Sequence, residues 1–217
     1  MTTNDTATNT GADTTAANTG ATSTAEQVRA VLHQLADVLD GIRDDQASDP
    51  TPCTEFDVTD LREHIVGWSS AFAAGFADSG GQAPEASATA VEGTGAAQVR
   101  AAGDRLVEGI AGGGAERPFT LADGNAMPGD MALAMTLWEY QVHGWDLATA
   151  TGQPWSPDEA PVEDSIAFAE PMLTPDFQGE GKAFAPRFEI ADDAPAIDRL
   201  VALSGRDPRW TGADTVS

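Results

Sequence analysis

The 217-residue chain has one cysteine, one lysine and no long run of apolar residues. A single cysteine, Cys53, cannot form an intramolecular disulfide. A membrane-spanning helix needs about 20 consecutive apolar residues, and the sequence therefore predicts none. The first residues also lack the charged and apolar regions of a secretory signal, so the expected location is the cytoplasm.

Positive charge is scarce throughout the chain. It has 35 acidic residues against 11 basic ones, which gives a formal net charge of −24. Such a surface repels phosphate backbones and anionic lipid headgroups, so we expect no nucleic-acid partner and no binding to membranes. The acidic surface serves solubility, including in a salty cytosol where screening makes dense charge tolerable. A specific cationic partner is the alternative.

The composition changes after the first 22 residues. Residues 1–22 are mostly Thr, Asn, Ala, Gly and Asp, which cannot bury enough apolar surface to offset the entropy of ordering, so we expect a disordered tail. In the whole chain, 41% of the residues are hydrophobic, enough to build a core. We expect one helical domain over residues 23–211 and a short tail over 212–217.

Apolar residues recur at helical spacing in several segments. Thr24 opens the first with a capping box that ends at Gln27, and Asp57 can cap the second. Helices are expected over about 24–42, 57–79, 95–111, 130–151 and 158–173, then an extended stretch at 184–190 and a short helix at 194–203. Residues 117–129 read as loop or extended chain. This order of expected helices along the chain predicts an all-α fold, an antiparallel helical bundle.

Two of the three histidines fall where they could meet a carboxylate. Glu139 lies four residues before His143, so both side chains leave one face of a helix one turn apart. His64 borders the apolar stripe of the second helix. If the two helices are neighbours, two imidazoles and a carboxylate converge, a set that often holds catalytic zinc with one position left to water. Nickel, iron(II) and manganese accept the same donors.

Each of these residues also has an ordinary interpretation. A histidine beside an apolar stripe is often a hydrogen-bonded core residue, and Glu at i−4 from His is often a solvated pair. Against this, an ionised Glu139 buried between Trp138 and Tyr140 would be costly without a partner. Spacing alone leaves two alternatives open, a metal site or a bundle whose histidines serve packing.

Two further residues lie near this set in sequence. Asp146, three residues after His143, either orients that histidine as an outer partner or is a capping or surface acid. Cys53 precedes the second helix and has no cationic neighbour in sequence to lower its pKa, which favours an inert buried thiol.

Other polar and aromatic residues have weaker claims to a role. His33 is expected to be structural or exposed. Arg100 and Arg105 either receive an anionic substrate or pair with surface acids. Three tryptophans either line a pocket mouth or belong to the core: Trp68, Trp138 and Trp145.

Three stretches of the chain resemble one known family. The first stretch contains TPC at 51–53 and DVTDL at 57–61, just before His64. The second is EYQVHGWDLA at 139–148, followed by TG at 151–152. The third contains DAP at 193–195, DRL at 198–200 and GRDPRW at 205–210. Together they resemble the mycothiol-dependent maleylpyruvate isomerase-like proteins of the DinB/YfiT-like superfamily. The C-terminal stretch is similar to a subfamily described as metal-binding.

The resemblance implies a DinB/YfiT-like four-helix bundle, here with an extra C-terminal helix and extended segment. It implies a divalent metal, zinc first and nickel, iron or manganese as alternatives, with His64, Glu139 and His143 as ligands. It also implies a low-molecular-weight thiol such as mycothiol as co-substrate for a small electrophile. The full isomerase has a separate thiol-binding C-terminal domain, and too few residues follow the fifth helix here to form it.

Two functional hypotheses follow from the sequence and the resemblance. The first is a metal-dependent thiol transferase or isomerase-like enzyme. The second is a non-catalytic metal-binding or stress-related bundle that pairs as a homodimer through exposed helix faces. An open coordination position would favour the first, and a fourth protein ligand would favour the second.

Overall fold

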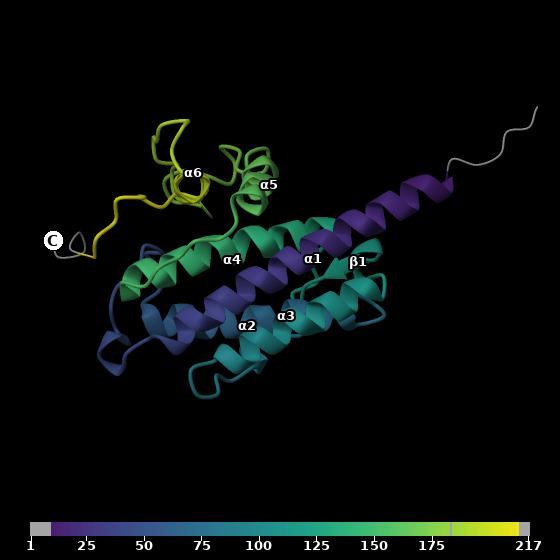
Figure 1. The fold of residues 1–217 in the computed structure, drawn as a ribbon, viewed down its shortest axis with the longest axis horizontal. Coiled ribbons are helices and arrows are strands. Elements are labelled where there is room, and N and C mark those ends of the chain that lie inside the picture. Colours follow the sequence, from purple (N-terminus) through teal and green to yellow (C-terminus); the bar gives the residue numbers. More distant parts are fainter. Residues whose placement is uncertain (1–9, 183, 213–217) are drawn as a thin grey trace, which may run out of the picture.

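The fold is mostly helical, with one small sheet. The computed structural model describes residues 10–182 and 184–212, and of residues 10–18 only the backbone. Within the described residues there are four long α-helices and two short ones, and the short ones lie nearer the C-terminus (Figure 1). The elements are α1 (Thr10–Asp40), α2 (Val58–Ala77), α3 (Ala96–Ala111), β1 (Pro118–Thr120), β2 (Ala126–Pro128), α4 (Gly129–Thr151), α5 (Glu159–Ala169) and α6 (Ala196–Leu203).

Helix α1 begins earlier than the sequence predicted. The expected start was Thr24, but the helix begins at Thr10 and continues without a break to Asp40. Residues 10–22 of the expected disordered tail are therefore helical, because no proline precedes Pro50 to interrupt a helix that extends from the apolar segment after Thr24. Residues 1–9, and nearly all of the tail expected at 212–217, lie outside the described residues.

A β-hairpin corrects the expected all-α class. Strands β1 and β2 pair antiparallel, with Phe119 opposite Met127, and the connecting turn contains Asp123-Gly124-Asn125. The sequence had predicted loop or extended chain here. The pairing forms because Phe119 is almost fully buried against the helices, which holds β1 in place for its partner strand.

Helices α2, α3 and α4 begin and end close to the predicted residues. The Asp57 carboxylate caps α2 by accepting a hydrogen bond from the backbone N–H of Asp60, as predicted. Gly112 follows α3, and Gly152 ends α4 in the left-handed conformation. Helix α5 was predicted to reach residue 173 but ends at Ala169, and the next residues turn.

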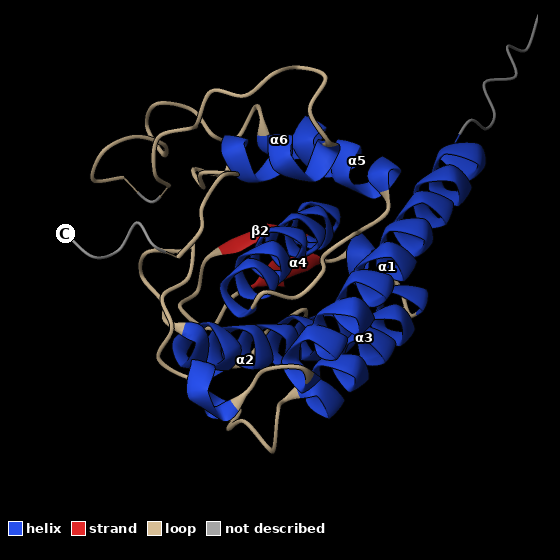
Figure 2. Ribbon diagram, turned by 60° about the vertical axis from the view of Figure 1, so that its left-hand side comes forward, coloured by secondary structure: helices blue, strands red, loops and turns tan. Residues whose placement is uncertain are grey.

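Two cores lie on opposite sides of α4. Figure 2 shows α4 with α5 and α6 on one side and α2 and α3 on the other. The first core consists of buried residues from α1, α2, α3 and α4, with Phe119 of β1 and Ala83 of the loop after α2. The second core joins α4 to the C-terminal part of the chain through Trp138, Val142, Trp145, Val162, Ala169, Leu173, Ala196, Leu200, Val201 and Leu203.

Helix α4 is consequently buried around most of its circumference, as its broad apolar set predicted. Among the described residues, no helix is long and apolar enough to cross a membrane.

Candidate metal centre

His64, Glu139 and His143 meet between α2 and α4. One donor atom from each side chain lies within 4.8 Å of the others. His64 Nε2 is 3.3 Å from Glu139 Oε1, and the two imidazole rings have centroids 4.9 Å apart. The i, i+4 spacing on α4 places Glu139 and His143 on one face, and α2 supplies His64 two turns after its cap. The structure thus brings together the three predicted ligands.

The geometry of this set suits a single divalent ion. Two donors that each lie about 2 Å from one ion in a tetrahedral arrangement are about 3.3 Å apart, the separation of His64 and Glu139. His64 Nε2 is buried, and no described residue completes a hydrogen bond to it. A buried nitrogen without a hydrogen-bond partner is expected at a ligand atom. That the set holds an ion stays a prediction.

Asp146 lies behind His143, on the side away from His64. The Asp146 carboxylate is fully buried, and its Oδ2 is 3.1 Å from His143 Nδ1. When Nδ1 carries the proton and donates to this oxygen, the lone pair of Nε2 is left free for a metal. The interpretation of Asp146 as an outer partner therefore fits the structure, and the surface or capping alternative is wrong.

Arg206 supplies the positive charge beside Asp146. Its Nη2 is 3.2 Å from Asp146 Oδ2, although the two residues are 60 positions apart in sequence. Burial by itself would raise the pKa of the Asp146 carboxyl, but the Arg206 charge and the His143 hydrogen bond outweigh burial and hold the pKa below its ordinary value. The carboxylate therefore stays ionised at neutral pH.

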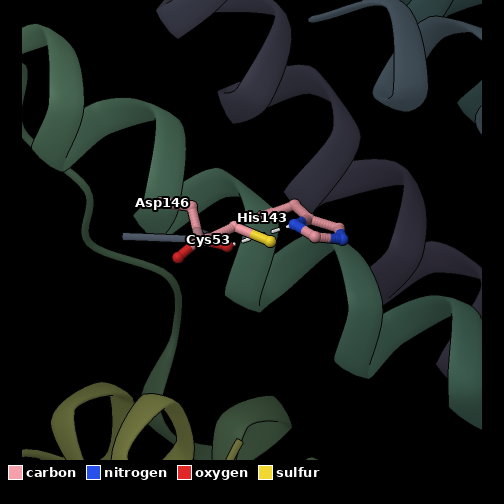
Figure 3. A group of neighbouring side chains, drawn as sticks. All are labelled: Cys53, His143 and Asp146. Atoms are coloured by element: carbon pink, nitrogen blue, oxygen red, sulfur yellow. Dashed lines mark hydrogen bonds and ion pairs between the residues drawn. The ribbon is translucent and has the colours of Figure 1, made fainter. Parts of the chain in front are cut away.

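Cys53 forms a second cluster with His143 and Asp146. Figure 3 shows its sulfur beside the His143 ring nitrogen that faces Asp146, while the other ring nitrogen points away. Donor atoms of the three residues lie within 4.8 Å of one another. Burial raises the pKa of the Cys53 thiol, and Asp146 is already paired with Arg206. Because the thiol is protonated and the charge of the carboxylate is already paired with Arg206, this cluster is better interpreted as packing behind His143 than as a second ion site.

Two hollows border the predicted ligands. A cavity of about 230 Å³ adjoins all three and reaches the C-terminal part of the chain. A wider, more polar groove of about 870 Å³ meets the first at His64. The cavity is lined by His64, Met135, Trp138, Glu139, Val142, His143, Phe184, Ser204 and Arg206. Another hollow, of about 780 Å³ near the β-hairpin, includes none of the three ligands.

The aromatic residues expected near the site divide into two groups. Trp138 lines the cavity and Trp68 lines the groove, with its ring centroid 6.3 Å from that of His64. Trp145 packs in the second core. Phe56, which the sequence analysis did not select, lies 4.9 Å from the His64 ring and 6.4 Å from the His143 ring, centroid to centroid.

The remaining candidates lie away from the site. His33 Nε2 is 3.4 Å from Asp104 Oδ1, and both side chains are partly exposed. Arg100 pairs with Asp37 and Asp40 of α1, which supports the ion-pair interpretation. Arg105 is exposed on α3.

Sequence reasoning predicted a buried thiol at Cys53, and the structure agrees, but it missed the position of Cys53 beside His143 and the role of Arg206. Both belong to stretches that carry the family resemblance, TPC at 51–53 and GRDPRW at 205–210, and this was the available signal. Because each is far from His143 along the chain, no spacing rule could connect them to it.

Comparisons with known proteins agree with the resemblance. Residues 28–148 match the family described as mycothiol maleylpyruvate isomerase N-terminal domain. Two uncharacterized proteins of Mycobacterium tuberculosis, from strains CDC 1551 / Oshkosh and ATCC 25618 / H37Rv, are each 33% identical over 174 residues, which is 80% of this chain and 92% of theirs. No solved structure matches the chain. The chain therefore belongs to the mycothiol maleylpyruvate isomerase N-terminal domain family.

Proposed function

We propose that this chain is a metal-dependent thiol transferase or isomerase-like protein built on a DinB-like four-helix bundle. His64, Glu139 and His143 would hold one divalent ion, with zinc the first candidate. The observation that carries the proposal is the convergence of these donors beside a cavity of about 230 Å³. An ion held there would act as a Lewis acid that lowers the pKa of a bound thiol.

The side chains around the ligands suit this chemistry. Asp146 would hold His143 with Nε2 toward the ion, and Glu139 would contribute a negative charge that balances it. Trp138, Val142 and Phe184 give the cavity apolar walls, which exclude water and accept the hydrocarbon part of a small electrophile. A low-molecular-weight thiol of the mycothiol type would be the nucleophile that adds to it.

The cavity also bears on the non-catalytic alternative. A structural zinc site is normally closed by a fourth protein ligand, whereas a catalytic one leaves a position open. Among the described residues, the cluster around Glu139 includes three donors, and Cys53 belongs to the separate group behind His143. Three donors facing a cavity favour the catalytic alternative.

Elemental analysis of metal content tests the site. Wild type, purified without chelators, should carry about one metal per chain, and His64→Ala and His143→Ala should carry almost none. His33→Ala is the matched control, because it removes the third histidine, which pairs with Asp104 away from the site. Absence of metal from wild type after incubation with zinc, nickel, iron(II) and manganese would refute the metal site.

Thiol-dependent turnover tests the reaction. Metal-loaded wild type should accelerate the reaction of mycothiol with a small electrophile such as 1-chloro-2,4-dinitrobenzene, in which a C–S bond replaces the C–Cl bond and chloride leaves, and the metal-free His143→Ala variant should not. A full complement of metal with no turnover of a panel of such electrophiles would contradict the enzyme and support the non-catalytic bundle.

A further inference from the structure

The segment that follows α6 reaches back to the site. It places Arg206 against Asp146, and the Arg206 side chain is itself mostly buried, with 13% of its surface exposed. Arg206 Nη1 donates to the Ser204 carbonyl at 2.8 Å, and the Arg206 backbone N–H donates to Val201 O at 2.9 Å. These bonds fix the guanidinium in one position relative to the end of α6.

Two contacts attach this segment to the rest of the site. Trp138 Nε1 donates to Ser204 Oγ at 2.9 Å, which ties the segment to α4. Gly205 has φ +82°, and a Cβ there would lie 2.6 Å from the Ala185 carbonyl oxygen. Only glycine adopts this backbone and fits this approach without strain, so the turn that presents Arg206 depends on it.

The hydrogen bonds around Asp146 show what Arg206 does. Oδ2 receives both His143 Nδ1 and Arg206 Nη2, while Oδ1 is buried and, among the described residues, has no hydrogen-bond partner. The carboxylate is therefore held by two contacts on one oxygen. Without Arg206 an uncompensated buried carboxylate would be costly, and it would rotate or draw in water, which removes a fixed acceptor from His143.

We propose that Arg206 is a positioning residue of the metal centre, which acts through Asp146 to fix the ring orientation and tautomer of His143. The inference rests on the proposed metal site. It assigns a role at that site to a residue outside the family match at 28–148. Through this contact, the second core contributes to metal affinity although it contains none of the three ligands.

The first test measures zinc affinity by competition with a chromophoric chelator. Arg206→Gln should weaken affinity about 10- to 100-fold, the usual cost of losing an outer partner of a ligand histidine. Arg206→Lys keeps the positive charge but loses the planar guanidinium with its several N–H donors, so it should retain part of the zinc affinity. Arg199→Gln is the matched control, because Arg199 is a C-terminal arginine that pairs with Glu163 instead.

A double-mutant cycle separates action through Asp146 from general damage. If Arg206 acts through the carboxylate, then Asp146→Asn combined with Arg206→Gln should weaken zinc binding no more than Asp146→Asn alone. Full additivity of the two losses would overturn the proposal. Circular dichroism and thermal unfolding of each variant identify any that fail to fold, and in that case Arg206→Lys and Asp146→Asn carry the comparison.

The tautomer of His143 provides a readout that needs no metal. Long-range ¹H–¹⁵N spectra of metal-free protein, which has only three histidines, should show His143 protonated at Nδ1 in wild type and a mixture in Arg206→Gln. An unchanged tautomer together with unchanged zinc affinity would overturn the role of Arg206. Failure of wild type to bind any of zinc, nickel, iron(II) and manganese, with the tautomer shift present, would refute the proposed function and leave the orienting contact established.

Discussion

The two cores on either side of α4 differ in composition and in what they give the site. The first is large and is filled mainly by aliphatic and phenylalanine side chains, together with Tyr140, from four helices and β1. The second is smaller and is built around Trp138 and Trp145 against α5 and α6. His64 comes from α2 of the first core, Glu139 and His143 come from α4, which both cores share, and Arg206 follows α6 of the second core. A site at such a border can take donors from one region and their orientation from the other.

The largest expected effect comes from a matched pair of leucine truncations. Leu106 of α3 and Leu200 of α6 are both fully buried, one in each core. Each change to alanine should lower the free energy of unfolding by about 2–5 kcal/mol, measured by chemical denaturation. Leu200→Ala should also weaken zinc binding, because α6 carries the segment with Arg206, and Leu106→Ala should not. Equal zinc affinities in the two variants would contradict this division between the cores.

The next-largest expected effect on the free energy of unfolding comes from changing two buried serines to alanine. Ser204→Ala leaves the buried Trp138 Nε1–H without its acceptor and should cost about 1–3 kcal/mol of unfolding free energy. Ser165 of α5 is equally buried, but its hydroxyl has no hydrogen-bond partner among the described residues. Ser165→Ala should therefore be neutral or stabilising in the same denaturation experiment. A loss at Ser165 as large as that at Ser204 would show that burial, and not the hydrogen bond, sets the cost.

The smallest expected effect compares the starts of two helices. Asp57 caps α2 through the Asp60 N–H, whereas Asp158 stands before α5 and makes no such bond. Asp57→Ala should cost about 1 kcal/mol, and Asp158→Ala a few tenths of that. Thermal unfolding of both variants against wild type measures the difference, and the reverse order would contradict the assignment of the cap.

Local patterns were enough to predict most of the helices and the placement of Glu139 and His143 on one face of α4. The Asp57 cap, the glycines after α3 and α4, and the broad apolar face of α4 all act within a few residues, and the structure agrees with each. The early start of α1 and the hairpin at β1 and β2 were missed. Neither has a strong local signal: residues 10–22 contain several threonines and two glycines but no proline, and β1 is held in place by the burial of Phe119, which is a tertiary contact.

By itself the sequence determined that Glu139 and His143 share a face, because positions i and i+4 of a helix are adjacent whatever surrounds them. It also determined, through the resemblance, that His64 is the third candidate ligand. Only the tertiary structure decided that α2 lies against α4 and that Arg206 meets Asp146 across 60 residues of chain. Contacts between distant residues follow from how helix faces pack around the two cores, and no local periodicity encodes that choice.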